Sequence, residues 1–69
     1  MAMKRNSVKR VREIMNISRA ELARLLGISR GAITNYEFNR RSPSIHIAKK
    51  IILLAKQRNI YISLEDVYF

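Results

Sequence analysis

At 69 residues and without a cysteine, the chain has room for one small domain, and its core must come from apolar packing because disulfides and thiolate metal sites are excluded. Fourteen lysines and arginines against five acidic residues give a net charge of +9, which admits nucleic acids, anionic lipids and acidic proteins as partners. No stretch approaches the roughly 20 consecutive apolar residues of a membrane span, and no secretory segment follows the basic start, so we expect a soluble protein that is not exported.

The first predicted helix runs from about Ser7 to Met15. Val8, Val11 and Met15 recur at the spacing of one helix face, which predicts that they point toward a core. Arg12 falls on the same stripe, so the inward face of this helix includes a charged side chain.

Two short helices are predicted next, at about 18–26 and 29–38. Ser18 can cap the first of them, and Glu21 stands three residues on, where its carboxylate can reach back to the Ser18 amide. Ser29 can cap the second helix. Both helices therefore have local starting signals.

The turn between these helices carries small residues where two crossing helices need them. Gly27 can take the positive φ that ends a helix without a Cβ clash, and Ala23 suits a crossing that has room for little more than a methyl group. Ile33 and Tyr36 give the second helix its inward face. The pattern predicts a helix-turn-helix whose outward face is made by Arg30, Gly31, Thr34 and Asn35.

A polar break at 39–43 precedes a longer predicted helix from Ser44 to about Arg58. Pro43 fixes the local turn, and Ser44 can cap the helix. This helix is apolar on nearly all sides, and such a helix is normally buried on more than one. We therefore expect one of its sides to face a partner.

The segment 59–69 forms an apolar tail to the single domain that we expect over 1–69. The tail begins with alternating Ile60 and Ile62, which is typical of a short extended piece, and a capped turn follows at 63–66. Its apolar end favours an interface. A C2 homodimer formed through the fourth helix and the tail is the simplest such arrangement.

The run from Val8 to Pro43, and more loosely the residues 63–68, resembles the Cro/cI-type helix-turn-helix family of phage and bacterial repressors. Together with the periodicities above, the resemblance implies an all-α, lambda-repressor-like bundle of about five short helices. It rests on Arg12, Leu22, Ala23, the Leu-Gly-Ile-Ser run at 26–29, Ile33, Tyr36, Glu37 and the Arg-x-Pro-Ser run at 41–44.

In that family the second helix of the motif enters the major groove of DNA, and its N-terminal residues touch base edges. An arginine there suits guanine, an asparagine can read adenine or reach a phosphate, an alanine can touch the methyl group of thymine, and a threonine can offer its hydroxyl or its methyl group. Gly31 stands where the family often has a side chain, so it removes one contact but lets the backbone approach closely. The base-contacting residues implied by the resemblance are Arg30, Gly31, Ala32, Thr34 and Asn35.

The same resemblance assigns phosphate contacts to capping and loop residues. Arg19 stands where glutamine is common, which keeps the phosphate role and alters the contact with the neighbouring helix. Asn39 replaces the usual glycine and tolerates the left-handed conformation. The phosphate-contacting residues implied are Ser18, Arg19, Asn39, Arg40, Arg41 and Ser44.

Arg12 and Glu37 match a pair that forms a buried salt bridge in related repressors, where it ties the first helix to the end of the second motif helix. Beyond Pro43 the match is weaker. The fourth helix is longer than usual and residues 57–61 resemble an insertion, so the family's dimer contacts do not transfer.

The resemblance implies a sequence-specific regulator in the cytoplasm, associated with the nucleoid, that acts as a repressor and binds a palindromic operator in double-stranded DNA as a homodimer. The alternative is an antitoxin-like regulator whose main partner is another protein held by the C-terminal region. An enzyme is not expected, because the single histidine and the five acids show no catalytic spacing. No cofactor or metal is expected, since His46 has no cysteine or second histidine beside it. A membrane-surface peptide is not expected either, because it would need one long amphipathic face and the predicted helices are short and broken.

Overall fold

The computed structural model describes residues 7–68, within which the chain forms five α-helices and no strand. This confirms the all-α class and the five helices expected from the sequence. Residues 1–6 and Phe69, the last residue of the apolar tail, lie outside the described part. The helices are α1 (Ser7–Met15), α2 (Arg19–Leu26), α3 (Arg30–Glu37), α4 (Ile45–Gln57) and α5 (Leu64–Tyr68).

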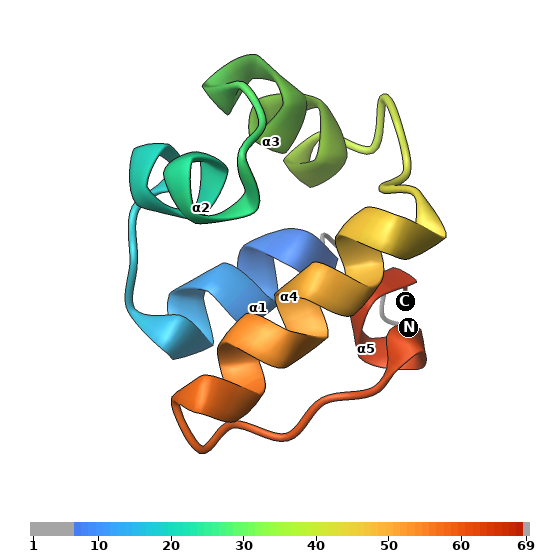
Figure 1. The fold of residues 1–69 in the computed structure, drawn as a ribbon. Helices are drawn as coiled ribbons and strands as arrows, with labels where there is room; N and C mark the ends of the chain where they lie inside the picture. The colour runs from blue at the N-terminus through green and yellow to red at the C-terminus, as the bar shows by residue number, and fades with distance from the viewer. Residues whose placement is uncertain (1–6, 69) are drawn as a thin grey trace.

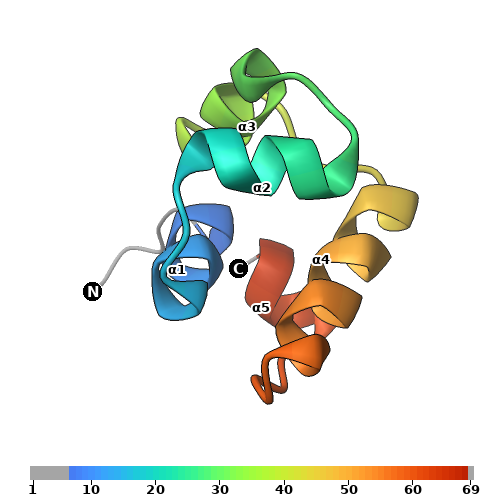
Figure 2. The same ribbon diagram turned by 60° about the vertical axis from the view of Figure 1, so that its left-hand side comes forward.

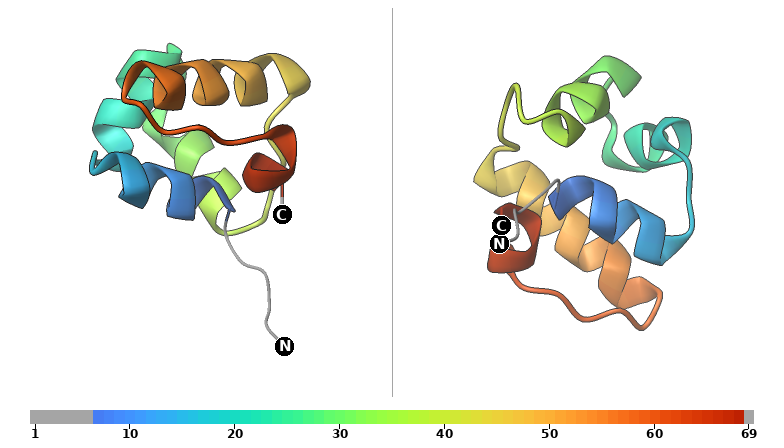
Figure 3. Two further views of the ribbon diagram at one scale, coloured as in Figure 1. Left: turned by 90° about the horizontal axis from the view of Figure 1, so that it is seen from below. Right: turned by 180° about the vertical axis from the view of Figure 1, so that it is seen from behind.

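α2 and α3 lie together on one side of the molecule, and α1, α4 and α5 make up the other side (Figure 1, Figure 2). α2 packs against both α3 and α4, and α5 packs against α1 and α4 (Figure 3). The apolar faces of all five helices meet in one core, which gives the small chain a single packed interior. Its buried apolar residues are Val8, Val11, Met15, Leu22, Ala23, Leu26, Ile33, Ala48, Ile51, Ala55 and Val67.

Three serines begin helices, as the sequence predicts. The hydroxyl oxygens of Ser18, Ser29 and Ser44 accept hydrogen bonds from backbone amides three residues on, at 3.0, 3.1 and 3.2 Å. Each bond satisfies one of the amides that a helix leaves unpaired at its start. The return contact predicted for Glu21 is wrong, because its carboxylate accepts instead from Arg24 of the same helix at 3.1 Å.

Two turns use the left-handed backbone conformation at residues that the sequence singled out. Gly27 has a φ of +73° and ends α2, and Asn39 has a φ of +58° in the turn after α3. Asn16 and Asn59 adopt the same conformation after α1 and α4, which was not predicted. Asparagine is one of the few residues with a side chain that tolerate this region, so the chain uses it where a helix must stop.

α4 has one buried and one exposed apolar side. Ala48, Ile51 and Ala55 are fully buried against the other helices. Ile45 and Leu53 are 51% and 54% exposed, so this helix presents large apolar side chains to the solvent.

The tail folds back onto its own chain. Val67 of α5 is buried, and the Tyr68 hydroxyl donates a hydrogen bond to the Pro43 carbonyl oxygen at 2.7 Å. The extended piece expected at Ile60 and Ile62 forms no strand, and both side chains pack against the core instead. Part of the apolar surface of the tail is therefore covered within the chain itself.

Candidate nucleic-acid interface

α3 is anchored in the core by its later turns and is exposed at its first turn. Ile33 and Glu37 of this helix are buried, while Arg30 and Gly31 at its first turn are exposed. Because 3.6 residues complete a helical turn, residues 34 and 35 lie on the same side as Arg30 and Gly31. The remaining residues expected to contact bases are half-buried on this helix and are Ala32, Thr34 and Asn35.

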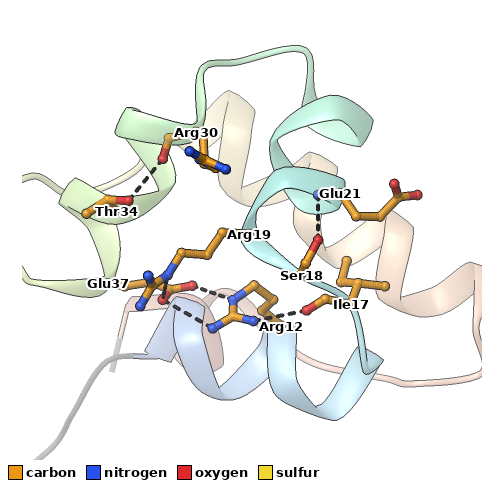
Figure 4. A network of polar contacts seen from close by, with 8 residues as sticks. All are labelled: Arg12, Ile17, Ser18, Arg19, Glu21, Arg30, Thr34 and Glu37. Atoms are coloured by element: carbon orange, nitrogen blue, oxygen red, sulfur yellow. Dashed lines mark hydrogen bonds and ion pairs between the residues drawn. The ribbon is translucent and has the colours of Figure 1, made fainter.

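Two open hollows flank α3, and most of the expected contact residues are divided between them. The α2-side hollow lies between α2 and α3 (Figure 4) and is lined by Arg12, Ser18, Arg19, Ala20, Arg30 and Thr34. The α4-side hollow lies between α3 and the loop leading to α4 and is lined by Ser29, Gly31, Ala32, Asn35, Tyr36, Arg41, Ser42 and Ser44. The expected contact residues that line neither hollow are Asn39 and Arg40.

A buried carboxylate holds two arginines beside the α2-side hollow (Figure 4). The Glu37 side chain is 1% exposed, and its oxygens accept from Arg12 Nε at 2.6 Å and from Arg19 Nε at 2.8 Å. A further bond joins Arg12 Nη2 to Glu37 Oε1 at 3.3 Å. Burial raises the pKa of Glu37, but the hydrogen bonds from Arg12 and Arg19 outweigh burial, so the pKa lies below its ordinary value and the carboxylate stays charged.

This network connects separate segments of the chain. Arg12 also donates through Nη1 to the Ile17 carbonyl at 3.0 Å, in the turn before α2. Arg12 thus links α1 to that turn and to the last residue of α3, and Arg19 links the start of α2 to the same carboxylate. The sequence pointed to Arg12 and Glu37 but not to this contact of Arg19. The sequence carried one signal of the Arg19–Glu37 contact, which is that position 19 holds arginine where the family commonly has glutamine.

Thr34 uses its hydroxyl within its own helix. Its Oγ1 donates to the Arg30 carbonyl at 3.2 Å (Figure 4). This bond occupies the only O–H donor of the side chain. The methyl group and the oxygen lone pairs of Thr34 are therefore what the helix can offer to a ligand.

The loop after α3 presents two exposed arginines. The backbone amides of Arg40 and Arg41 donate to the Asn35 carbonyl at 2.8 and 3.3 Å, which folds the loop back against the end of α3. The left-handed backbone of Asn39 permits this reversal. Phe38, the C-cap of α3, is 57% exposed beside Arg40, and the sequence analysis gave it no role.

Residues 8–54, more than half of the chain, match the helix-turn-helix family. The chain belongs to this family. α2 and α3, with the turn at Gly27 between them, form its helix-turn-helix motif, and the match extends over α1 and most of α4. The resemblance drawn from the sequence is therefore confirmed as a Cro/cI-like helix-turn-helix domain.

Two archaeal proteins resemble this helix-turn-helix chain. One, from Methanocaldococcus jannaschii, is named as a candidate HTH-type transcriptional regulatory protein and is 48% identical over 44 residues, which make up 64% of this chain and 14% of that protein. The other, an uncharacterized HTH-type transcriptional regulator from Archaeoglobus fulgidus, is 41% identical over 46 residues, which make up 67% of this chain and 20% of that protein. The chain thus matches a fifth or less of the length of either relative, and neither relative supports the phage or bacterial origin expected from the sequence.

The described part of the chain offers neither a metal site nor a membrane-spanning helix. Among residues 7–68, no three histidine or acidic side chains gather in a way that could hold a metal ion. None of the helices in this range has the length and the apolar character that crossing a membrane requires.

Proposed function

We propose that this protein is a transcriptional regulator that binds double-stranded DNA with α3 in the major groove. The observation that carries the proposal is the exposed first turn of α3, where Arg30 and Gly31 face the solvent while Ile33 and Glu37 anchor the rest of the helix. A helix reads the major groove only when it protrudes from the domain with its outward side chains free. The names of the two archaeal relatives support the same role.

In this role the outward side of α3 reads base edges. Arg30 donates to N7 and O6 of guanine, and the Asn35 amide pairs with N6 and N7 of adenine. The methyl groups of Ala32 and Thr34 contact thymine methyl groups, because the Thr34 hydroxyl is already bonded within the helix. Gly31 adds no side chain, so the helix backbone approaches the bases closely at its first turn.

Four of the residues proposed to contact phosphates are also divided between the two hollows. Ser18 and Arg19 contact one strand from the α2-side hollow, and Arg41 and Ser44 contact the other strand from the α4-side hollow. These contacts fix the orientation of the protein on the duplex without reading its sequence. The loop adds phosphate contacts from Asn39 and Arg40.

We further propose that the whole chain is one domain that acts as a homodimeric repressor. Exposed Ile45 and Leu53 on α4, together with half-covered Leu64 in the tail at 59–69, offer apolar surface that a second copy would cover. A C2 dimer reads a palindromic operator whose half-sites lie about 34 Å apart. Bound at a promoter, such a dimer blocks transcription. We place it in the cytoplasm, associated with the nucleoid.

Selection of bound duplexes from a random DNA pool tests the proposal. The expected product is an enriched inverted repeat, for which the affinity falls with salt with a logarithmic slope of about −0.9 for each phosphate neutralised. A pool that stays random after selection would refute sequence-specific binding. A protein–DNA complex that sediments with only one protein copy on the operator would refute the dimer. Purification of the chain together with a second, tightly bound protein would favour the antitoxin-like alternative.

A further inference from the structure

Phe38 is an exposed aromatic residue that the fold itself does not explain. Its side chain is 57% exposed, although it stands on the basic side of the molecule next to the end of α3. Its contribution to the helix is made by its backbone amide, which donates to the Thr34 carbonyl at 3.0 Å and would do so with any side chain. The cap bond therefore does not account for an aromatic side chain at this position.

The Phe38 ring lies under two arginines from different segments. The Cζ atom of Arg19, the first residue of α2, is 5.8 Å from the ring centroid, and the Cζ atom of Arg40, in the loop after α3, is 5.4 Å from it. Both distances are within the roughly 6 Å over which the negative face of an aromatic ring attracts a guanidinium group. The ring thus offsets the repulsion between two like charges that the fold brings to one place.

We propose that Phe38 is a positioning residue that holds Arg19 and Arg40 ready for two DNA phosphates. This inference rests on the DNA-binding role proposed above. Arg19 donates through Nε to Glu37 at 2.8 Å, and the Phe38 ring adds a second contact to the same guanidinium group. Arg40 is exposed and is restrained by the ring beside it. Holding both guanidinium groups before binding reduces the rotamer freedom that they lose when phosphates arrive.

The proposal predicts a uniform loss of affinity when the ring is removed. Phe38→Leu keeps an apolar side chain but has no aromatic face, so we expect binding to weaken about fivefold, because the arginine side chains must then be ordered when the phosphates arrive. The loss should be equal on the selected operator and on an unrelated duplex of the same length, because phosphates carry no sequence information. The salt slope should stay unchanged, because both arginines still reach the DNA. Phe38→Tyr, which keeps the ring, should bind as the natural protein does.

A double-mutant cycle measured by fluorescence anisotropy decides between this role and a direct contact of the ring. In an Arg40→Gln background, which lowers the salt slope by about 0.9, Phe38→Leu should cost only about twofold, because one of its two cations is gone. An undiminished fivefold cost in that background, or a Phe38→Tyr protein as weak as Phe38→Leu, would overturn the inference. Ile14→Ala removes an equally exposed apolar side chain from α1, at 55%, and serves as the control that should not change binding.

Two further readouts separate the possible failures. The melting temperature of Phe38→Leu should fall by no more than about 4 to 8 °C, as the loss of two exposed cation–π contacts allows, and a larger drop would assign the ring a structural role and reject the inference. If the natural protein binds no duplex at all, the proposed function itself fails. If it binds DNA and Phe38→Leu binds equally well, only the role of Phe38 fails.

Discussion

Replacing Glu37 by glutamine tests how far the fold depends on its buried charge. The amide has nearly the same shape as the carboxylate, so Glu37→Gln removes the charge and turns one of the two accepting oxygens into an N–H donor that faces the arginines. Arg12, whose side chain is 13% exposed, would then keep a positive charge without its partner at 2.6 Å. An uncompensated charge in such a place is strongly destabilising.

The magnitude follows from the exposure of the three groups. Breaking a buried ion pair costs about 3 to 5 kcal/mol, and we expect the lower end, about 3 kcal/mol, because the amide oxygen still accepts one bond from Arg12. Arg19 adds little, since its side chain is 38% exposed and water can solvate it. In a domain of this size, each kcal/mol shifts the melting temperature by about 4 to 8 °C, so Glu37→Gln should melt roughly 12 to 24 °C lower.

Thermal unfolding followed by circular dichroism measures this shift, with Glu21→Gln as the matched control. Glu21 carries the same charge and pairs with Arg24 on the open surface, where we expect almost no change. A Glu37→Gln protein that melts within a few degrees of the control would refute the reasoning.

Acid provides a second measurement of the same charge. Because the pKa of Glu37 is lowered in the folded state, its contribution is fully present above the ordinary value of 4.5 and is lost as the pH falls through the lower folded value. The difference in stability between the natural protein and Glu37→Gln should therefore narrow below about pH 4.5.

Three other substitutions have definite expected outcomes. Arg30→Ala should lose about 1 to 3 kcal/mol of discrimination at one base pair, measured on singly substituted operators, and an equal loss on every duplex would place Arg30 on a phosphate instead. Gly31→Ala should raise the melting temperature, because a Cβ there meets nothing nearer than the Ser29 hydroxyl at 3.8 Å and alanine favours a helix by up to about 1 kcal/mol. The same variant should bind DNA more weakly, and undiminished binding would contradict a close approach at this turn. Tyr68→Phe should cost about 1 kcal/mol in denaturant unfolding by removing the bond to the Pro43 carbonyl, and an unchanged midpoint would show that this bond adds nothing.

Local signals in the sequence predicted most of the helical frame. The serine caps and the left-handed Gly27 each depend on groups within a few residues along the chain, so the sequence holds the whole interaction. The predicted helix starts at 18, 29 and 44 fall one residue before the observed ones, because the capping serine was counted as the first helical residue. The outward side of α3 was found in the same way, from the period of its buried residues.

Contacts between distant segments were not predicted unless the family resemblance supplied them. The bond from Arg19 to Glu37 spans 18 residues and exists only because α2 and α3 cross at a particular angle. The cluster at Phe38 depends on the same crossing and on the path of the next loop. The alternation of Ile60 and Ile62 predicted a short extended piece, and residues 60–63 form neither helix nor strand. That both side chains pack against the core depends on distant helices and was not predicted.

The three helices that begin beside the two hollows are capped by serine and not by aspartate. Aspartate caps a helix as well as serine does. Helix capping alone therefore does not explain why all three of these residues, Ser18, Ser29 and Ser44, are serine. A hydroxyl that accepts a bond from an amide still has its own hydrogen to give, whereas a carboxylate at neutral pH has none and repels a phosphate. Exchanging serine for aspartate at these positions would keep the caps but place a negative charge where a phosphate would come, so the hydroxyl suits both the fold and the binding of an anion.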